Sequence, residues 1–150
     1  MELILWRHAE AEDGEPDEER RLTGRGKKQA KRVAKWLARR LPEDFAVISS
    51  PARRALQTAR ALGVEAAIEE ALGVNASPET LLRALGWPDG GERTVVAVGH
   101  QPALGQAAAL ALTGRVAALA LGKGAFVWIA TRKRRAGEVR LRAAGSPDLL

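Results

Sequence analysis

The chain has no cysteine, which excludes both a disulfide framework and a cysteine-based metal site. Its longest apolar stretches, such as residues 106–112, are much shorter than the roughly 18 to 20 residues that a membrane span needs. The first residues also lack the charged, apolar and small-residue segments of a secretory signal. We therefore expect a soluble, cytoplasmic protein with no membrane partner.

Aromatic residues are scarce as well: there is no tyrosine, and the four tryptophans are scattered along the chain. Single-stranded nucleic acid is bound by basic grooves that carry stacking aromatic side chains, and this sequence does not interleave the two. The net charge of +6 still indicates an anionic partner, which is a phosphate group, a nucleic acid or an acidic protein face. The basic run Arg132 to Arg135 is interpreted as a solvated turn, with contact to nucleic acid or an acidic partner as the alternative.

Short apolar runs alternate with segments of helical periodicity, and 150 residues fit one domain spanning residues 1–150. This alternation predicts an α/β fold, a three-layer α/β/α sandwich around a mainly parallel central sheet. The last two runs predict a closing hairpin. Strands are expected at residues 2–6, 45–48, 64–68, 94–98, 125–131 and 138–143, and helices at residues 25–41, 51–62, 78–85 and from Pro102 to about Thr113.

Three helix starts carry a hydroxyl residue at the position of an N-cap. Thr23, Ser50 and Ser77 each precede a helical pattern, and a proline follows two of them at the first helical position. The segment from Asp13 to Arg21 is dense in charge and contains a glycine and a proline. It is therefore expected to be an exposed loop.

The chain has two histidines, and each follows directly on an apolar strand. His8 comes after residues 2–6 with Arg7 between them, and His100 comes after residues 94–98 with Gly99 between them. Ligands in open α/β sheets bind outside the carboxyl ends of the strands. Either histidine alone fits a structural role, but together they predict a site at this edge of the sheet.

Arginines accompany both the first strand and the second strand-to-helix junction. Arg7 precedes His8, and Arg54 lies on the first turn of the helix expected after Ser50-Pro51. A phosphoryl group in transfer carries negative charge on its equatorial oxygens, and planar guanidinium groups match that geometry. Two histidines and two arginines at one edge therefore favour phosphoryl transfer.

Four segments resemble the motifs of the histidine phosphatase superfamily. The sequence Arg7-His8-Ala9-Glu10 looks like its Arg-His-Gly-Glu/Asp signature, and residues 50–59 resemble its Ser-Pro-x-x-Arg-Ala-x-Gln-Thr-Ala segment. Gly99-His100 matches the late Gly/Ser-His, and Leu22-Thr23 with Gly26 is similar to the family's Leu-Thr-x-x-Gly. The matches follow the family's order from residue 3 to about residue 105.

The resemblance implies a phosphoglycerate mutase-like fold and a phosphatase that needs no cofactor. It implies that His8 is the nucleophile and that Arg7, Arg54 and His100 hold the phosphoryl group. Arg54, and not Arg53, occupies the motif position. A neutral imidazole can attack phosphorus and give a phosphoenzyme that water hydrolyses. A dianionic ligand beside His100 should favour its protonated form.

Two features depart from the family pattern. Ala9 replaces the usual glycine, and its methyl group is expected to restrict the backbone and narrow the pocket. Many members carry a carboxylate acid on an insertion over the site, and this chain is too short for that insertion. Glu69 and Glu70 are the nearest candidates for such an acid, although a solvated edge explains them equally well.

The missing insertion implies a resemblance to bacterial phosphohistidine phosphatases that act on histidine phosphotransfer domains. A phosphoramidate nitrogen can be protonated before it leaves, so this substrate depends less on an enzyme carboxylic acid. The alternatives are a metal-independent phosphatase of small phosphate esters or nucleotides, and a non-catalytic module that binds phosphate or nucleic acid. The sequence leaves the oligomeric state open.

Metal and nucleotide sites are less favoured. The two histidines with Glu10 or Glu12 could ligate a cation, but the neighbouring arginines would repel it. Residues 122–124 lack the spacing of a phosphate-binding P-loop, and no Gly-x-Gly-x-x-Gly follows the first strand. We therefore expect no metal and no nucleotide cofactor.

Overall fold

A computed structural model of the chain describes residues 1–131 and 137–150. Six of its strands form one sheet with the order β3-β2-β4-β1-β5-β6. The strands are β1 (Glu2–Arg7), β2 (Ala46–Ser49), β3 (Ala67–Ile68), β4 (Thr94–Gly99), β5 (Phe126–Thr131) and β6 (Val139–Gly145).

The sheet has a parallel part and an antiparallel edge. Strands β3, β2, β4 and β1 run parallel to one another. Strand β5 pairs antiparallel with β1, and β6 pairs antiparallel with β5. The predictions of a mainly parallel sheet and of a closing hairpin are therefore confirmed. The basic run Arg132 to Arg135, interpreted from the sequence as a solvated turn, lies outside the described residues.

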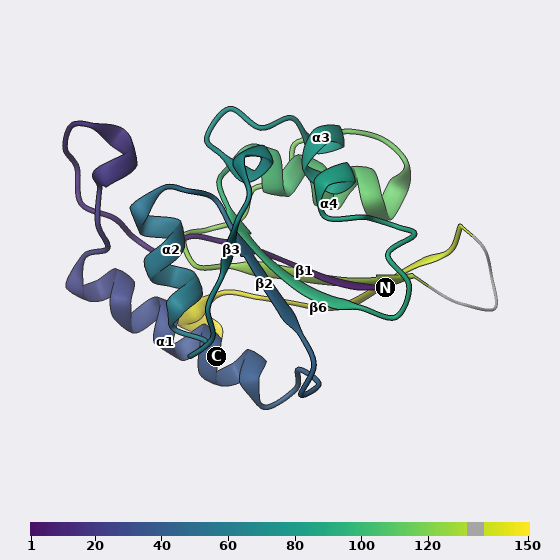
Figure 1. The fold of residues 1–150 in the computed structure, drawn as a ribbon, viewed down its shortest axis with the longest axis horizontal. Coiled ribbons are helices and arrows are strands. Elements are labelled where there is room, and N and C mark those ends of the chain that lie inside the picture. Colours follow the sequence, from purple (N-terminus) through teal and green to yellow (C-terminus); the bar gives the residue numbers. More distant parts are fainter. Residues whose placement is uncertain (132–136) are drawn as a thin grey trace.

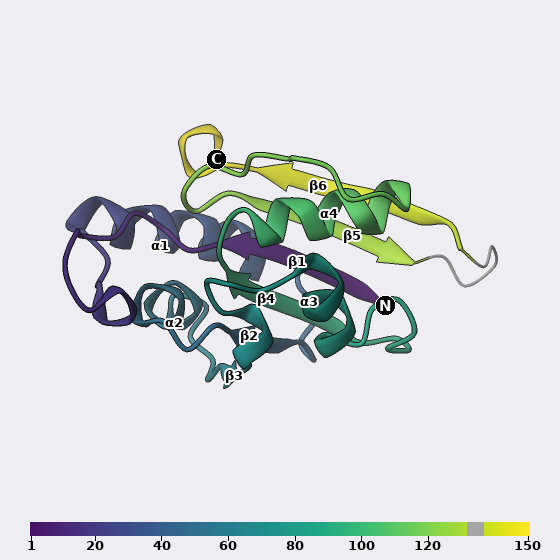
Figure 2. The ribbon, with the colours of Figure 1, turned by 90° about the horizontal axis from the view of Figure 1, so that it is seen from above.

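Helices cover both faces of the sheet. Figure 1 shows α3 and α4 on one side and α1 and α2 on the other, and Figure 2 shows the same layers from above. This is the expected α/β/α sandwich. The helices are α1 (Gly24–Ala38), α2 (Arg53–Arg60), α3 (Pro78–Ala84) and α4 (Ala103–Thr113), and short 3-10 turns occupy η1 (Asp17–Glu19), η2 (Glu70–Leu72) and η3 (Pro147–Leu149).

The central strands are buried on both faces, so their residues alternate between two cores. Leu3 and Leu5 of β1 pack with residues of α3 and α4 in one core. Ile4 and Trp6 pack with residues of α1 and α2 in the other. Burial on both faces explains why β1 and β4 appear in the sequence as continuous apolar runs.

Some element boundaries differ from the predicted ones. The Thr23 and Ser77 side chains accept hydrogen bonds from backbone N–H groups of α1 and α3, so these two caps are confirmed. The Ser50 cap is wrong, because α2 begins at Arg53 with Ala52 before it. Helix α1 ends at Ala38 instead of residue 41, and β3 has only two residues.

The carboxyl ends of three neighbouring parallel strands meet at one edge of the sheet. The pairing of β1 with β4 continues past the strand ends, where the His8 N–H donates to Gly99 O at 3.1 Å. On the other side of β4, the Ser50 N–H donates to Val98 O at 2.9 Å. The residues that follow β1, β4 and β2 are thus held side by side. Among the described residues, no helix is long and apolar enough to cross a membrane.

Candidate active site

His8 is buried at the end of β1 with a fixed orientation and tautomer. Its Nδ1 lies 2.7 Å from Ala9 O. A carbonyl oxygen can only accept, so Nδ1 carries the proton and donates. The other ring nitrogen, Nε2, accepts from Arg54 Nε at 3.3 Å. His8 therefore presents an unprotonated Nε2 to the guanidinium group of Arg54.

The environment of His8 keeps its imidazole neutral. Burial lowers the pKa of His8 to about 4, and the hydrogen bond to the Ala9 carbonyl opposes this shift only in part. The positive charges of Arg54 and Arg7 lower the pKa further. At neutral pH the ring is therefore an available nucleophile, because only the unprotonated form has a free lone pair.

His100 faces His8 across the same edge of the sheet. The centroids of the two rings are 5.1 Å apart. The His100 Nε2 lies 2.7 Å from Ser50 Oγ, and its Nδ1 lies 3.5 Å from NH2 of Arg54. Since the guanidinium group can only donate, Nδ1 is unprotonated and Nε2 donates to the serine. Ser50 thus orients His100 instead of capping a helix.

His100 is neutral in this arrangement. Burial lowers its pKa to about 3, and repulsion by His8 and Arg54 contributes in the same direction. The protonation expected of His100 beside a dianionic ligand stays a prediction. A ligand that favours that form would have to supply enough negative charge to offset the burial.

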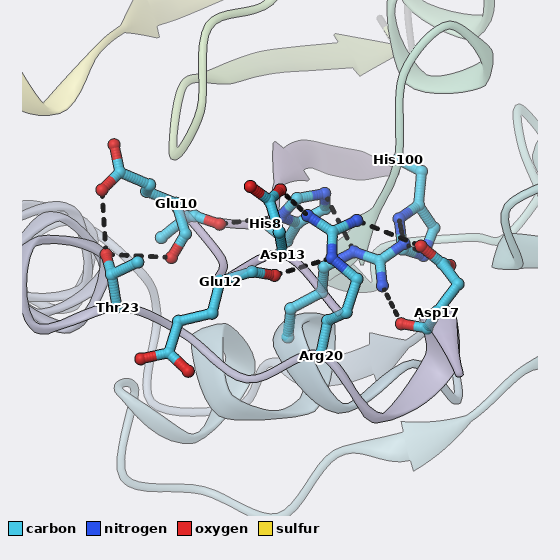
Figure 3. A network of polar contacts seen from close by, with 10 residues as sticks. His8, Glu10, Glu12, Asp13, Asp17, Arg20, Thr23 and His100 are labelled. Carbon is cyan, nitrogen blue, oxygen red and sulfur yellow. Dashed lines mark hydrogen bonds and ion pairs between the residues drawn. The ribbon is translucent and has the colours of Figure 1, made fainter. Parts of the chain in front are cut away.

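Arg54 connects the two histidines to the loop that follows β1. Its side chain is only 4% exposed. Besides its contact with His8, it donates from NH1 to the backbone oxygen of Asp17 at 2.8 Å and from NH2 to Asp17 Oδ2 at 3.0 Å. Figure 3 shows Asp17 on the same side of the site as the two histidines. Asp17 therefore forms an ion pair with Arg54, the side chain that the sequence predicts to bind a phosphoryl group.

Arg7 reaches the pocket from the last position of β1. Its NH1 donates to Leu121 O at 2.7 Å. Its Nε is the one buried side-chain nitrogen or oxygen without a hydrogen-bond partner among the described residues. Burial lowers the pKa of Arg7 from its usual value. A buried donor of this kind is costly unless a ligand accepts from it, so the site is suited to an anion.

These side chains line one hollow of about 270 Å³ at the edge of the sheet. The structure brings together all four residues assigned from the sequence, and their catalytic roles stay predictions. Several further residues line the same pocket. The complete lining consists of Arg7, His8, Ala11, Asp17, Arg20, Arg54, Val74, His100, Gln101 and Lys123.

Sequence reasoning missed Asp17 and Arg20, which lie in the segment expected to be an exposed loop. Arg20 donates to Asp17 Oδ1 at 3.0 Å and to Glu12 O at 2.7 Å, as drawn in Figure 3. Hydrogen bonds from Arg20 and Arg54 lower the pKa of Asp17, so its carboxyl is ionised at neutral pH. Neither hydrophobic periodicity nor a helix-cap pattern in the sequence predicts which loop residue reaches a pocket, because the geometry of a loop depends on tertiary contacts.

Thr58 and Gly26, which belong to the family motifs, contact the backbone of the residues after His8. The Thr58 hydroxyl accepts from the Ala9 N–H at 3.0 Å and donates to Arg54 O at 2.8 Å. Gly26 is required by a close approach, since a Cβ there would lie 1.9 Å from Glu10 O. Ala9 itself is fully buried among the side chains on the α1 and α2 face. Its methyl group does not line the pocket, so the expected narrowing is wrong.

The glutamates suggested from the sequence lie elsewhere. Glu69 accepts from the Ala71 N–H, Glu70 begins η2, and neither lines the pocket. Glu10 contacts Thr23, and Glu12 pairs with Arg21 on the surface. Within the described residues no group of three or more histidines and carboxylates is placed to hold a metal ion.

The comparisons with known proteins agree with this geometry. A family model described as histidine phosphatase superfamily, branch 1, matches residues 3–74, a span that includes Arg7, His8 and Arg54. Over these residues the chain is similar to the histidine phosphatase superfamily. His100 lies beyond the matched span, at the equivalent edge of the neighbouring strand.

Relatives of the chain include an uncharacterized protein from Mycobacterium tuberculosis, which is 34% identical over 99 residues, or 64% of this chain. A protein from Mycobacterium leprae, also uncharacterized, is 33% identical over 99 residues. The chain spans 63% of the length of the first of these relatives and 61% of the second.

Two solved structures share the fold over nearly the whole chain. The protein histidine phosphatase SixA in complex with tungstate superposes with a TM-score of 0.85 at 23% identity, covering 99% of this chain and 98% of that one. A phosphoserine phosphatase variant from Entamoeba histolytica gives 0.70 at 21% identity, covering 97% of both chains. At these identities the comparison establishes the fold, which is the expected phosphoglycerate mutase-like one.

Proposed function

We propose that the protein is a phosphatase that transfers a phosphoryl group from a phosphohistidine protein to His8 and then to water. One observation carries this proposal: His8 Nε2 is unprotonated, fixed in direction and in contact with Arg54 inside an anion-suited pocket. The match of residues 3–74 to the histidine phosphatase superfamily and the tungstate complex of SixA support it, because tungstate is a tetrahedral oxyanion like phosphate.

In the first step the lone pair of His8 Nε2 attacks phosphorus in line with the leaving group. A bond forms between Nε2 and phosphorus, and the bond from phosphorus to the substrate imidazole breaks. The leaving nitrogen keeps the electron pair and takes a proton from solvent water, and the water that hydrolyses phospho-His8 later returns one proton to the solvent. Arg54 and Arg7 stabilise the charge on the equatorial oxygens, and Nδ1 of His8 keeps its proton through Ala9 O.

In the second step a water molecule attacks the phosphorus of phospho-His8. The bond to Nε2 breaks, inorganic phosphate leaves and the neutral imidazole is restored. The fixed hydrogen bond from Nδ1 to Ala9 O means that the ring needs no change of tautomer between the two steps. His100 is placed beside His8 to donate to a phosphate oxygen once it is protonated.

A protein substrate is supported by the shape of the site. Two of the residues that line the pocket, Lys123 and Val74, are exposed. A phosphorylated side chain on a protein surface can therefore reach His8. A phosphohistidine leaving group also fits a site whose carboxylate, Asp17, is ionised and engaged with Arg54, since it requires less acid catalysis than an ester.

The test is to incubate the protein with a phosphohistidine-bearing phosphotransfer domain and, separately, with an aryl phosphate, and to measure the phosphate released. His8→Ala is the control. Release from the phosphoprotein that requires His8 supports the proposal. Turnover of the ester alone would replace it with a small-molecule phosphatase, and binding of phosphate without turnover would replace it with a binding module.

One observation favours the small-ester alternative. Asp17 brings a carboxylate to the pocket, and it would protonate the leaving oxygen of an ester only if the bound ester displaced it from Arg54 and it took up a proton. A phosphoserine phosphatase from Entamoeba histolytica shares this fold. The ratio of kcat/KM for the phosphoprotein to kcat/KM for the ester shows which of the two substrates the site prefers.

A further inference from the structure

Two oppositely charged segments flank the pocket. Residues 10–19 contain seven acidic residues and no basic one, and residues 24–40 contain eight basic residues and no acidic one. The first segment is the loop that carries Asp17 to the site, and the second consists of helix α1 with the two residues after it. Figure 1 shows the loop crossing from the end of β1 to the start of α1.

One face of α1 forms a hollow, which we name the α1 groove. It has a volume of about 350 Å³. Four cationic side chains line it, three from successive turns of the helix and the fourth from the loop before β5, and they face one carboxylate. The lining consists of Arg25, Lys28, Gln29, Arg32, Lys123, Pro147 and Asp148.

Lys123 connects the α1 groove to the active site, because it lines both hollows. Its position is fixed by its neighbours in the loop. The Gly124 N–H donates to His8 O at 3.1 Å, and the Arg7 N–H donates to Ala125 O at 2.9 Å. The groove is therefore a continuation of the pocket and not a separate patch on the surface.

The cations of the groove are only partly neutralised within the protein. Arg25 lies 3.7 Å from Glu10, and Arg32 donates to the backbone oxygen of Pro147 at 3.0 Å. Lys28 is exposed, and Asp148 is the one acidic residue of the lining. A partner surface with several carboxylates would complement this charge pattern.

We propose that the α1 groove docks the acidic face of the phosphorylated protein substrate and orients its phosphohistidine toward His8. This proposal rests on the proposed function. The acidic segment at residues 10–19 repels the same acidic face, so the substrate binds in one orientation across the pocket. An acidic protein is favoured over a nucleic acid because no aromatic side chain lines the groove for base stacking.

The test compares two substrates of one chemistry: free phosphohistidine and phosphohistidine in an acidic phosphotransfer domain. Lys28→Glu reverses one charge of the groove outside the catalytic pocket. Lys31→Glu is the matched control, because Lys31 is an exposed lysine of the same helix that does not line the groove. Each variant's kcat/KM is measured for both substrates at low and at physiological salt.

We expect Lys28→Glu to lower kcat/KM for the phosphoprotein roughly three- to tenfold and to leave kcat/KM for free phosphohistidine unchanged. The loss should shrink as salt rises, and Lys31→Glu should have a much smaller effect. Equal effects on both substrates, or no effect of Lys28→Glu, overturn the docking proposal while the proposed function stands. Failure of the unmodified protein to hydrolyse the phosphoprotein overturns both.

A nucleic-acid partner is the remaining outcome of the same experiment. A labelled duplex oligonucleotide is added as a competitor of phosphoprotein turnover. Binding of the duplex that depends on Lys28, together with phosphoprotein turnover that does not, assigns the groove to nucleic acid and overturns the proposal.

Discussion

Arg54 donates to Asp17 twice, from NH2 to the carboxylate at 3.0 Å and from NH1 to the backbone oxygen at 2.8 Å. The same guanidinium group contacts both histidines of the site. Four of its five N–H donors are therefore engaged inside the protein. A phosphate oxygen that binds Arg54 has to compete with the Asp17 carboxylate.

Asp17→Asn should strengthen the binding of phosphate. The change removes a negative charge that pairs with Arg54 and opposes an incoming anion, while it keeps the shape of the side chain. The Asp17 side chain is about half exposed, so the gain is modest, about 1 kcal/mol or roughly fivefold. The measurement is the inhibition constant of inorganic phosphate or tungstate.

Asp13→Asn is the matched control for this prediction. Asp13 lies in the same loop, is fully exposed and lies 4.0 Å from Arg20. It should leave the inhibition constant nearly unchanged. Weaker phosphate binding by Asp17→Asn would mean that the carboxylate organises Arg54 for the anion and does not compete with it.

The histidines should remain neutral over an unusually wide pH range. Burial lowers the pKa of His8 to about 4 and that of His100 to about 3, against about 6.5 in an unfolded chain. The unfolded state therefore binds more protons below pH 6.5. The stability from these two groups is present above about 6.5 and is lost as the pH falls toward 4.

An NMR titration of the imidazole signals checks this prediction directly, because the chain has only two histidines. Neither signal should titrate between about pH 8 and pH 5. His100→Gln assigns the spectrum by removing one signal. A midpoint near 6.5 for His8 would show that the buried, neutral imidazole described here is wrong.

Gly26→Ala should disturb the backbone that follows the nucleophile. The added Cβ would lie 1.9 Å from Glu10 O, so α1 or residues 9–11 must move. Activity should fall at least tenfold, with a loss of about 2 kcal/mol in the free energy of unfolding. Gly24→Ala is the control, since a Cβ there meets nothing within 4 Å. Similar behaviour of the two variants would contradict the close approach at Gly26.

The family motifs made the catalytic constellation predictable, since they place His8, Arg54 and His100 after strands or at a helix start. In the structure, β4 pairs in parallel with β1 and with β2, and this pairing brings the carboxyl ends of the three strands together. The role of Ser50 was not predictable from local chemistry. Its hydroxyl suits an N-cap, but the contact with His100 depends on two strands that are distant in the sequence.

The loop over the pocket is the part that the sequence could not define. Its acidic residues indicate exposure, which holds for residues 12–19. Only the tertiary structure shows that one of them, Asp17, reaches Arg54. Glu69 and Glu70, the carboxylates suggested from the sequence, lie outside the pocket, and only the folded loop brings Asp17 to it.

Thr58→Val should remove the hydrogen bond that holds the backbone after His8 against α2. The substitution keeps the side-chain shape but leaves the buried Ala9 N–H without its acceptor. We expect a loss of about 1 to 3 kcal/mol in the free energy of unfolding and a fall in kcat. Thr58→Ser keeps the hydroxyl and should retain most of the activity. Equal losses in both variants would show that the methyl group matters, and not the hydrogen bond.

The central claim is that the phosphoryl group moves onto His8. The most direct measurement is to mix the protein with a labelled phosphohistidine domain, quench in alkali during turnover and locate the label by peptide mass spectrometry. We predict an acid-labile phosphoryl group on the peptide that contains His8, and none on His8→Ala. A label on another residue, or undiminished phosphate release by His8→Ala, would contradict the account.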